Sequence, residues 1–166
     1  MNVASRVAKG LSLVAGGAAC ARSGPVAPSC PGFPGEGGRS AHPTLSEIFA
    51  ASPRDAGWAG FLLPQIAPGK PLLWVQQRMA IVESGRVHPP GLAGFELIHV
   101  EARDAREALW AMEEALRCSG LSAVIGELWG DPASLDFTAT RRLAVAAERT
   151  GVPCWLVRLG GTASLS

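Results

Sequence analysis

The sequence lacks a strong excess of charge of either sign, and this narrows the range of partners to expect. Its 166 residues include 15 lysines and arginines and 14 aspartates and glutamates, a formal net charge of +1. Modules that bind DNA on their own usually present a strongly basic face. Tight autonomous DNA binding is therefore not expected, and the composition gives no support for attraction to a membrane surface or an acidic substrate.

Paired cysteines are also lacking. The four cysteines (Cys20, Cys30, Cys118 and Cys154) form no C-x-x-C pair, and the three histidines lie far from them in sequence. Neither a zinc site nor a disulfide framework is expected, and the pattern is typical of a reducing compartment. We expect Cys118 and Cys154 to be buried, unreactive thiols.

No apolar run reaches the roughly 18 residues that a membrane span needs. The N-terminus carries Arg6 and Lys9 ahead of a short apolar stretch, a faint likeness to a secretory signal. Gly16 and Gly17 interrupt that stretch. Cytoplasmic localisation without membrane contact is therefore the prediction, with export as the alternative.

Glycine and proline divide the chain into two parts. Residues 20–40 are rich in both, a composition that buries little apolar surface. We therefore expect residues 1–44 to be a flexible or disordered N-terminal segment. The folded domain is expected to span residues 45–166.

After Leu45 the chain alternates short apolar runs with helical patterns, which is typical of βαβ units. Strands are predicted at residues 45–49, 71–76, 95–100, 121–126 and 152–157, and helices at 58–67, between Asp104 and Gly120, and at 136–150. Residues 85–94 are predicted to be mostly loop. Successive crossovers of this type are right-handed, which predicts an α/β sandwich with a mainly parallel central sheet between helical layers.

The two longer helices carry start, stop and charge signals. Asp104 and Asp136 are suitable N-caps, and Gly151 is a suitable stop for the last helix. Oppositely charged residues at i, i+4 spacing predict the surface ion pairs Arg103–Glu107 and Glu113–Arg117. Each such pair stabilises a helix by only about 0.2–0.5 kcal/mol.

The first strand-to-helix turn is where a phosphate-binding loop would lie in this type of sheet. The pattern G-x-x-x-x-G-K-[ST] supplies backbone amides, a lysine and a hydroxyl for the phosphates and Mg²⁺. Different residues occupy the turn here: Ser52, Pro53, Arg54, Asp55, Ala56 and Gly57. Asp55 would repel a triphosphate, so nucleotide hydrolysis is not expected. The sequence contains no G-x-S-x-G, H-E-x-x-H or strand-linked G-x-G-x-x-G motif either, and no catalytic, cofactor or metal residue is assigned.

Partner contacts are the remaining role for the prominent polar and aromatic residues. Glu127 follows an apolar strand run, and a structural or interface role is favoured over metal binding. Arg141 and Arg142 could meet phosphate or an acidic partner. The candidate partner-binding residues are Trp110, Glu113, Glu114, Arg117, Glu127, Arg141 and Arg142.

Several segments together resemble the ImuA family, the RecA-like accessory proteins of bacterial damage-induced mutagenesis. They are Pro71-Leu-Leu-Trp-Val75, Glu96-Leu-Ile-His-Val100, Ala108-Leu-Trp-Ala-Met-Glu-Glu-Ala-Leu-Arg-Cys118, Leu121-Ser-Ala-Val-Ile-Gly-Glu127 and Thr140-Arg-Arg-Leu-Ala-Val-Ala-Ala-Glu148. The resemblance implies a RecA-like α/β fold from about Leu45 to Leu159. It places the phosphate-loop lysine position near Ala56 and the catalytic glutamate position near Gln77, and Glu127 near the end of the metal-site strand.

The resemblance also implies a function in SOS-induced, error-prone translesion DNA synthesis. Partners would be an ImuB-like Y-family polymerase subunit and, indirectly, a DnaE-type error-prone polymerase, with DNA reached only through the complex. Self-association stays open. ImuA proteins usually continue past Ser166 into a basic tail, so the expectation is a C-terminally truncated domain.

Two other functions stay open. SulA-type inhibitors of cell division share the RecA-like layout, so a SulA-like division inhibitor is the main alternative. An enzyme that uses the first loop for an unrecognised mode of nucleotide binding is the third.

Overall fold

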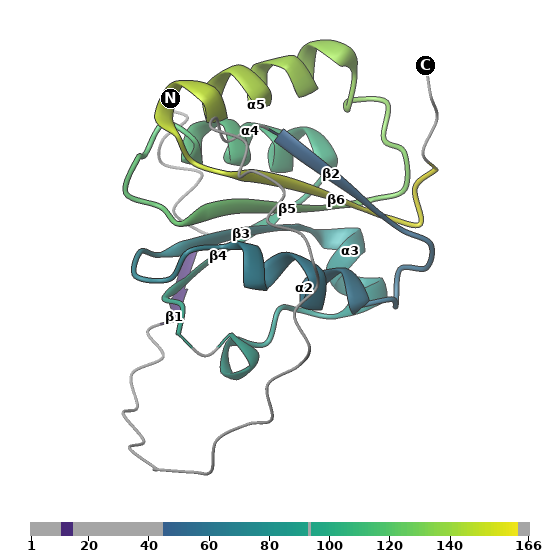
Figure 1. The fold of residues 1–166 in the computed structure, drawn as a ribbon. Coiled ribbons are helices and arrows are strands. Elements are labelled where there is room, and N and C mark those ends of the chain that lie inside the picture. Colours follow the sequence, from purple (N-terminus) through teal and green to yellow (C-terminus); the bar gives the residue numbers. More distant parts are fainter. Residues whose placement is uncertain (1–10, 15–44, 93, 163–166) are drawn as a thin grey trace, which may run out of the picture.

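A computed structural model describes residues 11–14, 45–92 and 94–162 as a sheet covered by helices on both faces (Figure 1). The strands are β1 (Leu11–Val14), β2 (Leu45–Ala50), β3 (Leu72–Gln77), β4 (Leu97–Ala102), β5 (Ala123–Trp129) and β6 (Cys154–Leu159). The helices are α2 (Gly57–Leu62), α3 (Arg78–Ser84), α4 (Ala105–Ala115) and α5 (Phe137–Thr150), with 3₁₀ turns at Leu63–Gln65 and Pro89–Gly91. The predicted α/β sandwich is confirmed.

The sheet order is β1-β4-β3-β5-β6-β2. Strands β2 to β6 pair in parallel, and β1 adds an antiparallel strand next to β4. The segment 1–44, predicted to be flexible, lies outside the described residues except for Leu11–Val14, which form β1. Cys20 and Cys30 likewise lie outside the described residues.

Helices α4 and α5 cover one face of the sheet, and α2 and α3 cover the other (Figure 1). Alternation along each strand sends side chains to both faces, so the domain has two cores. Met112, Leu116 and Leu143 fill the first against Val124 and Leu156. The second lies under α2 and α3, and its buried members include Leu62, Ile66, Ala80, Trp74 and Ile125.

Both long helices begin as the sequence predicts. Asp104 Oδ1 accepts a hydrogen bond from the Glu107 amide at 2.9 Å, and Asp136 Oδ1 accepts one from the Ala139 amide at 2.7 Å. Gly151 ends α5 in the left-handed region, with φ of 75°. The prediction that Gly120 ends α4 is wrong, because the helix stops at Ala115.

Two further differences concern single segments. Helix α3 was not predicted, because only Ala80 of its seven residues is buried and no apolar stripe marks it.

Cys154 is buried, which raises the pKa of its thiol to about 12. Cys118 is exposed instead, because it follows the end of α4, so its predicted burial is wrong. Among the described residues, no helix is long and apolar enough to cross a membrane.

Candidate functional site

Two hollows of the surface contain most of the residues that the sequence singles out. The first lies at the carboxyl edge of the parallel strands, where ligands bind in open α/β sheets. It encloses about 280 Å³ between the loop after β2 and the ends of β3 and β5. Its walls include Arg54, Asp55, Trp58, Trp74 and Glu127.

The loop after β2 bonds mainly to itself. Asp55 Oδ1 accepts a hydrogen bond from the Gly57 amide at 2.9 Å, and the Asp55 amide donates to the Ser52 carbonyl at 3.0 Å. Ser52, Arg54, Asp55, Ala56 and Gly57 are exposed, and Pro53 is half-buried. The Asp55 carboxylate therefore sits at the start of α2, where a phosphate loop would present free backbone amides.

Glu127 forms the floor of this hollow and is only 3% exposed. Its Oε1 accepts a hydrogen bond from Trp74 Nε1 at 2.5 Å, and its Oε2 accepts one from Gln76 Nε2 at 3.1 Å. Burial raises the pKa of the Glu127 carboxyl, and these two neutral donors only partly offset that effect. These two hydrogen bonds link β5 to its neighbour β3, which fits a structural role for Glu127.

His99 continues the polar chain from Gln76 to the surface. Gln76 Oε1 lies 2.9 Å from His99 Nε2, and Arg86 NH1 lies 3.1 Å from His99 Nδ1. A guanidinium can only donate, so Nδ1 accepts and the ring proton resides on Nε2, which donates to Gln76. Burial, and then the Arg86 charge, lower the pKa of His99.

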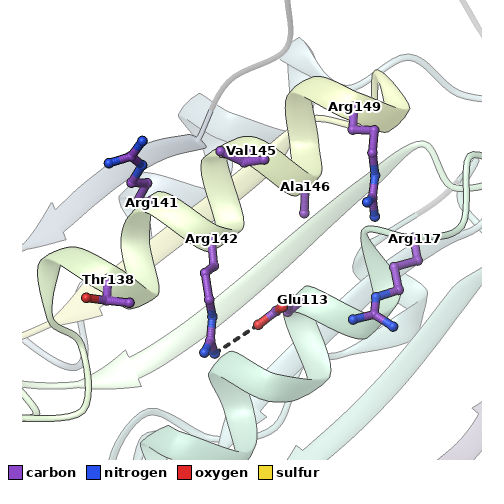
Figure 2. Close-up of a pocket in the computed structure, with 8 residues that line it drawn as sticks. All are labelled: Glu113, Arg117, Thr138, Arg141, Arg142, Val145, Ala146 and Arg149. Atoms are coloured by element: carbon purple, nitrogen blue, oxygen red, sulfur yellow. Dashed lines mark ion pairs between the residues drawn. The ribbon is translucent and has the colours of Figure 1, made fainter.

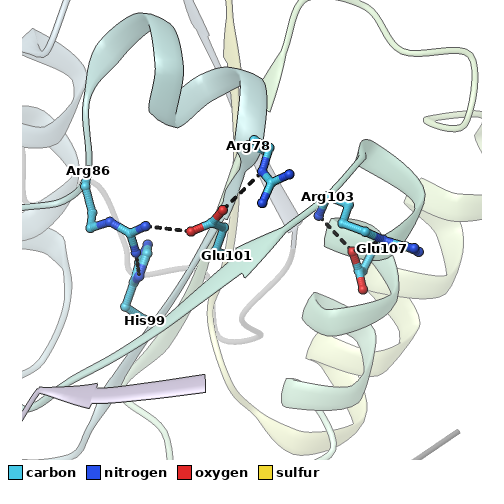
Figure 3. Close-up of polar contacts among 6 residues, drawn as sticks. All are labelled: Arg78, Arg86, His99, Glu101, Arg103 and Glu107. Atoms are coloured by element: carbon cyan, nitrogen blue, oxygen red, sulfur yellow. Dashed lines mark hydrogen bonds and ion pairs between the residues drawn. The ribbon is translucent and has the colours of Figure 1, made fainter. Parts of the chain in front are cut away.

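Glu101 ends this chain of contacts (Figure 3). It forms ion pairs with Arg86 at 2.5 Å and with Arg78 at 3.3 Å. The Arg86 hydrogen bond is the main reason that the pKa of Glu101 is lowered. Gln76 Nε2 also donates to the Gly85 carbonyl at 3.1 Å, so the network fastens the segment after α3 to the sheet.

The chemistry that this edge supports is limited. Gln77, at the position that the resemblance assigns to a catalytic glutamate, uses its side-chain oxygen to accept the Trp129 amide at 2.9 Å. In the part of the chain that the structure describes, no group of three His, Cys, Asp or Glu side chains could hold a metal ion. The polar groups at this edge bond to one another and hold strands and loops in place.

The second hollow lies between α4 and α5 and encloses about 290 Å³ (Figure 2). We call it the α4/α5 groove. Residues of α4, of the segment just after it and of α5 line it: Glu113, Arg117, Thr138, Arg141, Arg142, Val145, Ala146 and Arg149.

The ion pairs of α4 differ in part from those expected. Arg103–Glu107 forms as predicted, at 3.1 Å. Glu113 instead pairs with Arg142 of α5 at 2.9 Å, and Arg117 pairs with Glu114 at 3.3 Å. The predicted pair Glu113–Arg117 is wrong because the neighbouring helix supplies a better-placed cation.

The structure thus brings five of the seven candidate partner-binding residues together. Glu113, Arg117, Arg141 and Arg142 line the groove, and Glu114 adjoins it through its ion pair. Trp110 is 40% exposed on α4, one turn before Glu113, whereas Glu127 is buried in the other hollow.

Sequence reasoning missed Val145 and Arg149, which also line the groove. Their spacing to Arg141 is the helical i, i+4, i+8, which places all three along one side of α5. That spacing is a signal that could have found them.

Comparison with known proteins supports the resemblance. No family model matches the chain. "Protein ImuA" from two strains of Caulobacter vibrioides is 35% identical over 83 residues, which are 50% of this chain and 32% of the relative. The match thus spans about a third of each curated relative. The resemblance to the ImuA family is confirmed over half of this chain.

A solved structure has a related outline. SulA from Pseudomonas aeruginosa is 20% identical, with a TM-score of 0.47 over 70% of this chain and 98% of that one. At this score the likeness carries no functional argument.

Proposed function

From the similarity to ImuA, we propose that this chain is a non-catalytic accessory protein of SOS-induced, error-prone translesion synthesis. The 35% identity over 83 residues carries the proposal. Its partners would be an ImuB-like Y-family polymerase subunit and, through it, a DnaE-type polymerase in the cytoplasm. DNA would be reached only through that complex.

The absence of ATP hydrolysis is part of the proposal. The resemblance would put Asp55 and Ala56 near the positions where a phosphate loop needs glycine and lysine, and the Asp55 carboxylate accepts a hydrogen bond from the amide at the start of α2. Glu127, which would lie at the metal-site strand, is committed to Trp74 and Gln76. These contacts support an adaptor over an enzyme.

The surface around the α4/α5 groove is the proposed contact site. It combines an exposed aromatic side chain, Trp110, with a row of arginines, and both residue types are enriched where interfaces gain most of their affinity. The side chains lie on two helices that are fixed to the sheet by Met112 and Leu143, so the surface is held in one shape.

Co-purification tests the proposal. A tagged 1–166 chain would be expressed with the ImuB-like subunit of the same genome, and stable recovery of that subunit is expected. Trp110→Ala should reduce recovery, whereas Phe61→Ala, which removes a 65%-exposed aromatic side chain from α2, should not. Circular dichroism of each variant would establish that it is folded.

Failure to recover the subunit with a folded chain would contradict the adaptor function. Filamentous growth on expression of the chain would then point to inhibition of cell division. ATP turnover above that of the buffer would contradict the non-catalytic part of the proposal.

A further inference from the structure

We propose that the α4/α5 groove binds an acidic peptide segment that carries an apolar side chain between its carboxylates. The inference rests on the proposed accessory function and names the chemistry of the partner at that surface. A net charge of +1 for the whole chain does not reveal this site, because its charge is local.

Positive charge gathers in the groove without enough carboxylates to balance it. Four arginines line it together with one glutamate, Glu113. Arg142 pairs with Glu113, and Arg117 pairs with Glu114. Arg141 and Arg149 have no ion pair among the described residues and are exposed, so an incoming anion can reach both.

The arrangement of these side chains favours an anion in the hollow itself. Figure 2 shows Arg149 reaching from α5 and Arg117 from the end of α4 toward the same space, with Arg142 turned to Glu113. Like charges that face one hollow repel each other, and a carboxylate placed between them relieves the repulsion. Arg141 points outward at the rim and offers a second contact.

Apolar surface lies between the charged positions. Val145 is 53% exposed and occupies the turn of α5 between Arg141 and Arg149, which are about 12 Å apart along the helix axis. Ala146, which is nearly buried, adds to the lining. A peptide with carboxylates at both ends of such a span would cover Val145 with an apolar side chain and remove it from water.

A nucleic-acid backbone fits this groove less well. Single-stranded and duplex backbones present phosphates at regular, closely spaced intervals. Here Glu113 adds a negative charge opposite the arginines of α5, and Val145 offers no bond to a phosphate. The exposed Trp110, on which a base could stack, lies one turn of α4 away and does not line the groove. A peptide that combines acidic and apolar side chains can pair with the arginines and cover Val145.

Fluorescence anisotropy with the 1–166 chain tests the inference. The probes would be a labelled twelve-residue peptide with aspartates and glutamates flanking two leucines, its lysine counterpart, and a labelled oligothymidylate of matched length. We expect the acidic peptide alone to bind, and to bind more weakly as salt is raised, because exposed ion pairs are screened.

Matched variants locate the site. Arg141→Glu and Arg149→Glu together should weaken binding of the acidic peptide by roughly tenfold or more, since each reversal replaces an attraction with a repulsion. Arg54→Glu removes an exposed arginine on the loop after β2 and should leave binding within about twofold of wild type. Val145→Asp should also weaken binding.

Three outcomes would overturn the inference. They are no binding of the acidic peptide, tighter binding of the oligothymidylate, or a loss of peptide affinity in Arg54→Glu equal to that in the Arg141→Glu, Arg149→Glu double variant. The co-purification experiment distinguishes a failure of the groove proposal from a failure of the proposed accessory function. If the Arg141→Glu, Arg149→Glu double variant still recovers the ImuB-like subunit, the groove proposal fails and the accessory function stands. If the wild type recovers no subunit, the accessory function fails whatever the peptide does.

Discussion

Two single side chains should make the stability of this domain depend on pH, because His99 and Glu127 are buried in one polar chain through Gln76. Burial favours the neutral form of both groups over the charged form. The pKa of His99 is therefore lowered and that of Glu127 is raised. The His99 shift makes stability fall as pH is lowered, whereas the Glu127 shift makes it fall as pH is raised.

The first prediction concerns His99. Its pKa is lowered from 6.5 in the folded chain, so below that pH the unfolded chain binds more protons and the free energy of unfolding falls. Above about pH 6.5 this contribution is fully present. His99→Gln should reduce the fall in the free energy of unfolding as pH is lowered from about 6.5 to 5. That fall is at most about 1.4 kcal/mol per pH unit. Urea unfolding across this range measures it, with the exposed His88→Gln as the control. An unchanged slope would contradict the prediction.

Glu127 gives the second prediction, with the opposite sign. Its folded pKa lies above 4.5, so the folded chain binds the proton more tightly and stability falls as pH rises from 4.5 through the folded pKa. Glu127→Gln should remove this decrease. The variant also weakens the contact with Gln76, which lowers stability by about 0.5–1.5 kcal/mol at every pH. The slope, measured by urea unfolding, is therefore the readout, and the exposed Glu96→Gln should keep the wild-type slope.

Among the elements, α4 packs closely on β5 at Gly126. A Cβ added at Gly126 would overlap the Sδ and Cε atoms of Met112, which is fully buried. A side chain at residue 126 would therefore displace the end of the Met112 side chain. Because Met112 is fully buried, its displaced atoms would press on the close-packed side chains around it.

We predict that Gly126→Ala lowers the free energy of unfolding by about 1–3 kcal/mol, as expected for overpacking. Adding Met112→Ala to it should cost less than the sum of the two single changes, since the shorter side chain removes the overlap and the added methyl group partly fills the cavity, with a coupling of about 0.5–3 kcal/mol. Gly60→Ala in α2 is the control, because its Cβ would meet nothing within 4 Å. Strict additivity in a denaturant double-mutant cycle would show that the overlap is absent.

Elements with a local signal could be predicted from the sequence. The five parallel strands and helix α5 follow from apolar periodicity and from the caps Asp136 and Gly151. Helix α3 could not be predicted, because Met79 and Val82 are exposed and Gln77 gives no side-chain cap. The ion pair of Glu113 with Arg142 was also out of reach, since it depends on how α4 and α5 lie against each other.

At the scale of the whole molecule, strand order is the feature that sequence periodicity does not determine. Each run predicts a strand, but its neighbours depend on where the crossovers return to the sheet. The order brings Trp74 and Gln76 of β3 beside Glu127 of β5, and so creates the buried polar chain. The groove is equally a product of assembly, because Arg141 and Arg142 become part of a site only when α4 lies next to α5.

The same order predicts how the domain opens. Strands β3 and β5 have a partner on each side and are covered by helices on both faces, whereas β2 pairs with β6 alone among the strands that the structure describes. The free energy of local opening rises with the number of contacts that must break. Amides of β3 and β5 should therefore exchange with solvent only on global unfolding. Amides of β2 should exchange faster than those of β5. Hydrogen exchange followed by mass spectrometry measures both. Protection of β2 equal to that of β5 would contradict this prediction and would mean that another strand pairs with β2 in solution. The molecular mass in solution would then show whether that strand comes from a second copy of the chain.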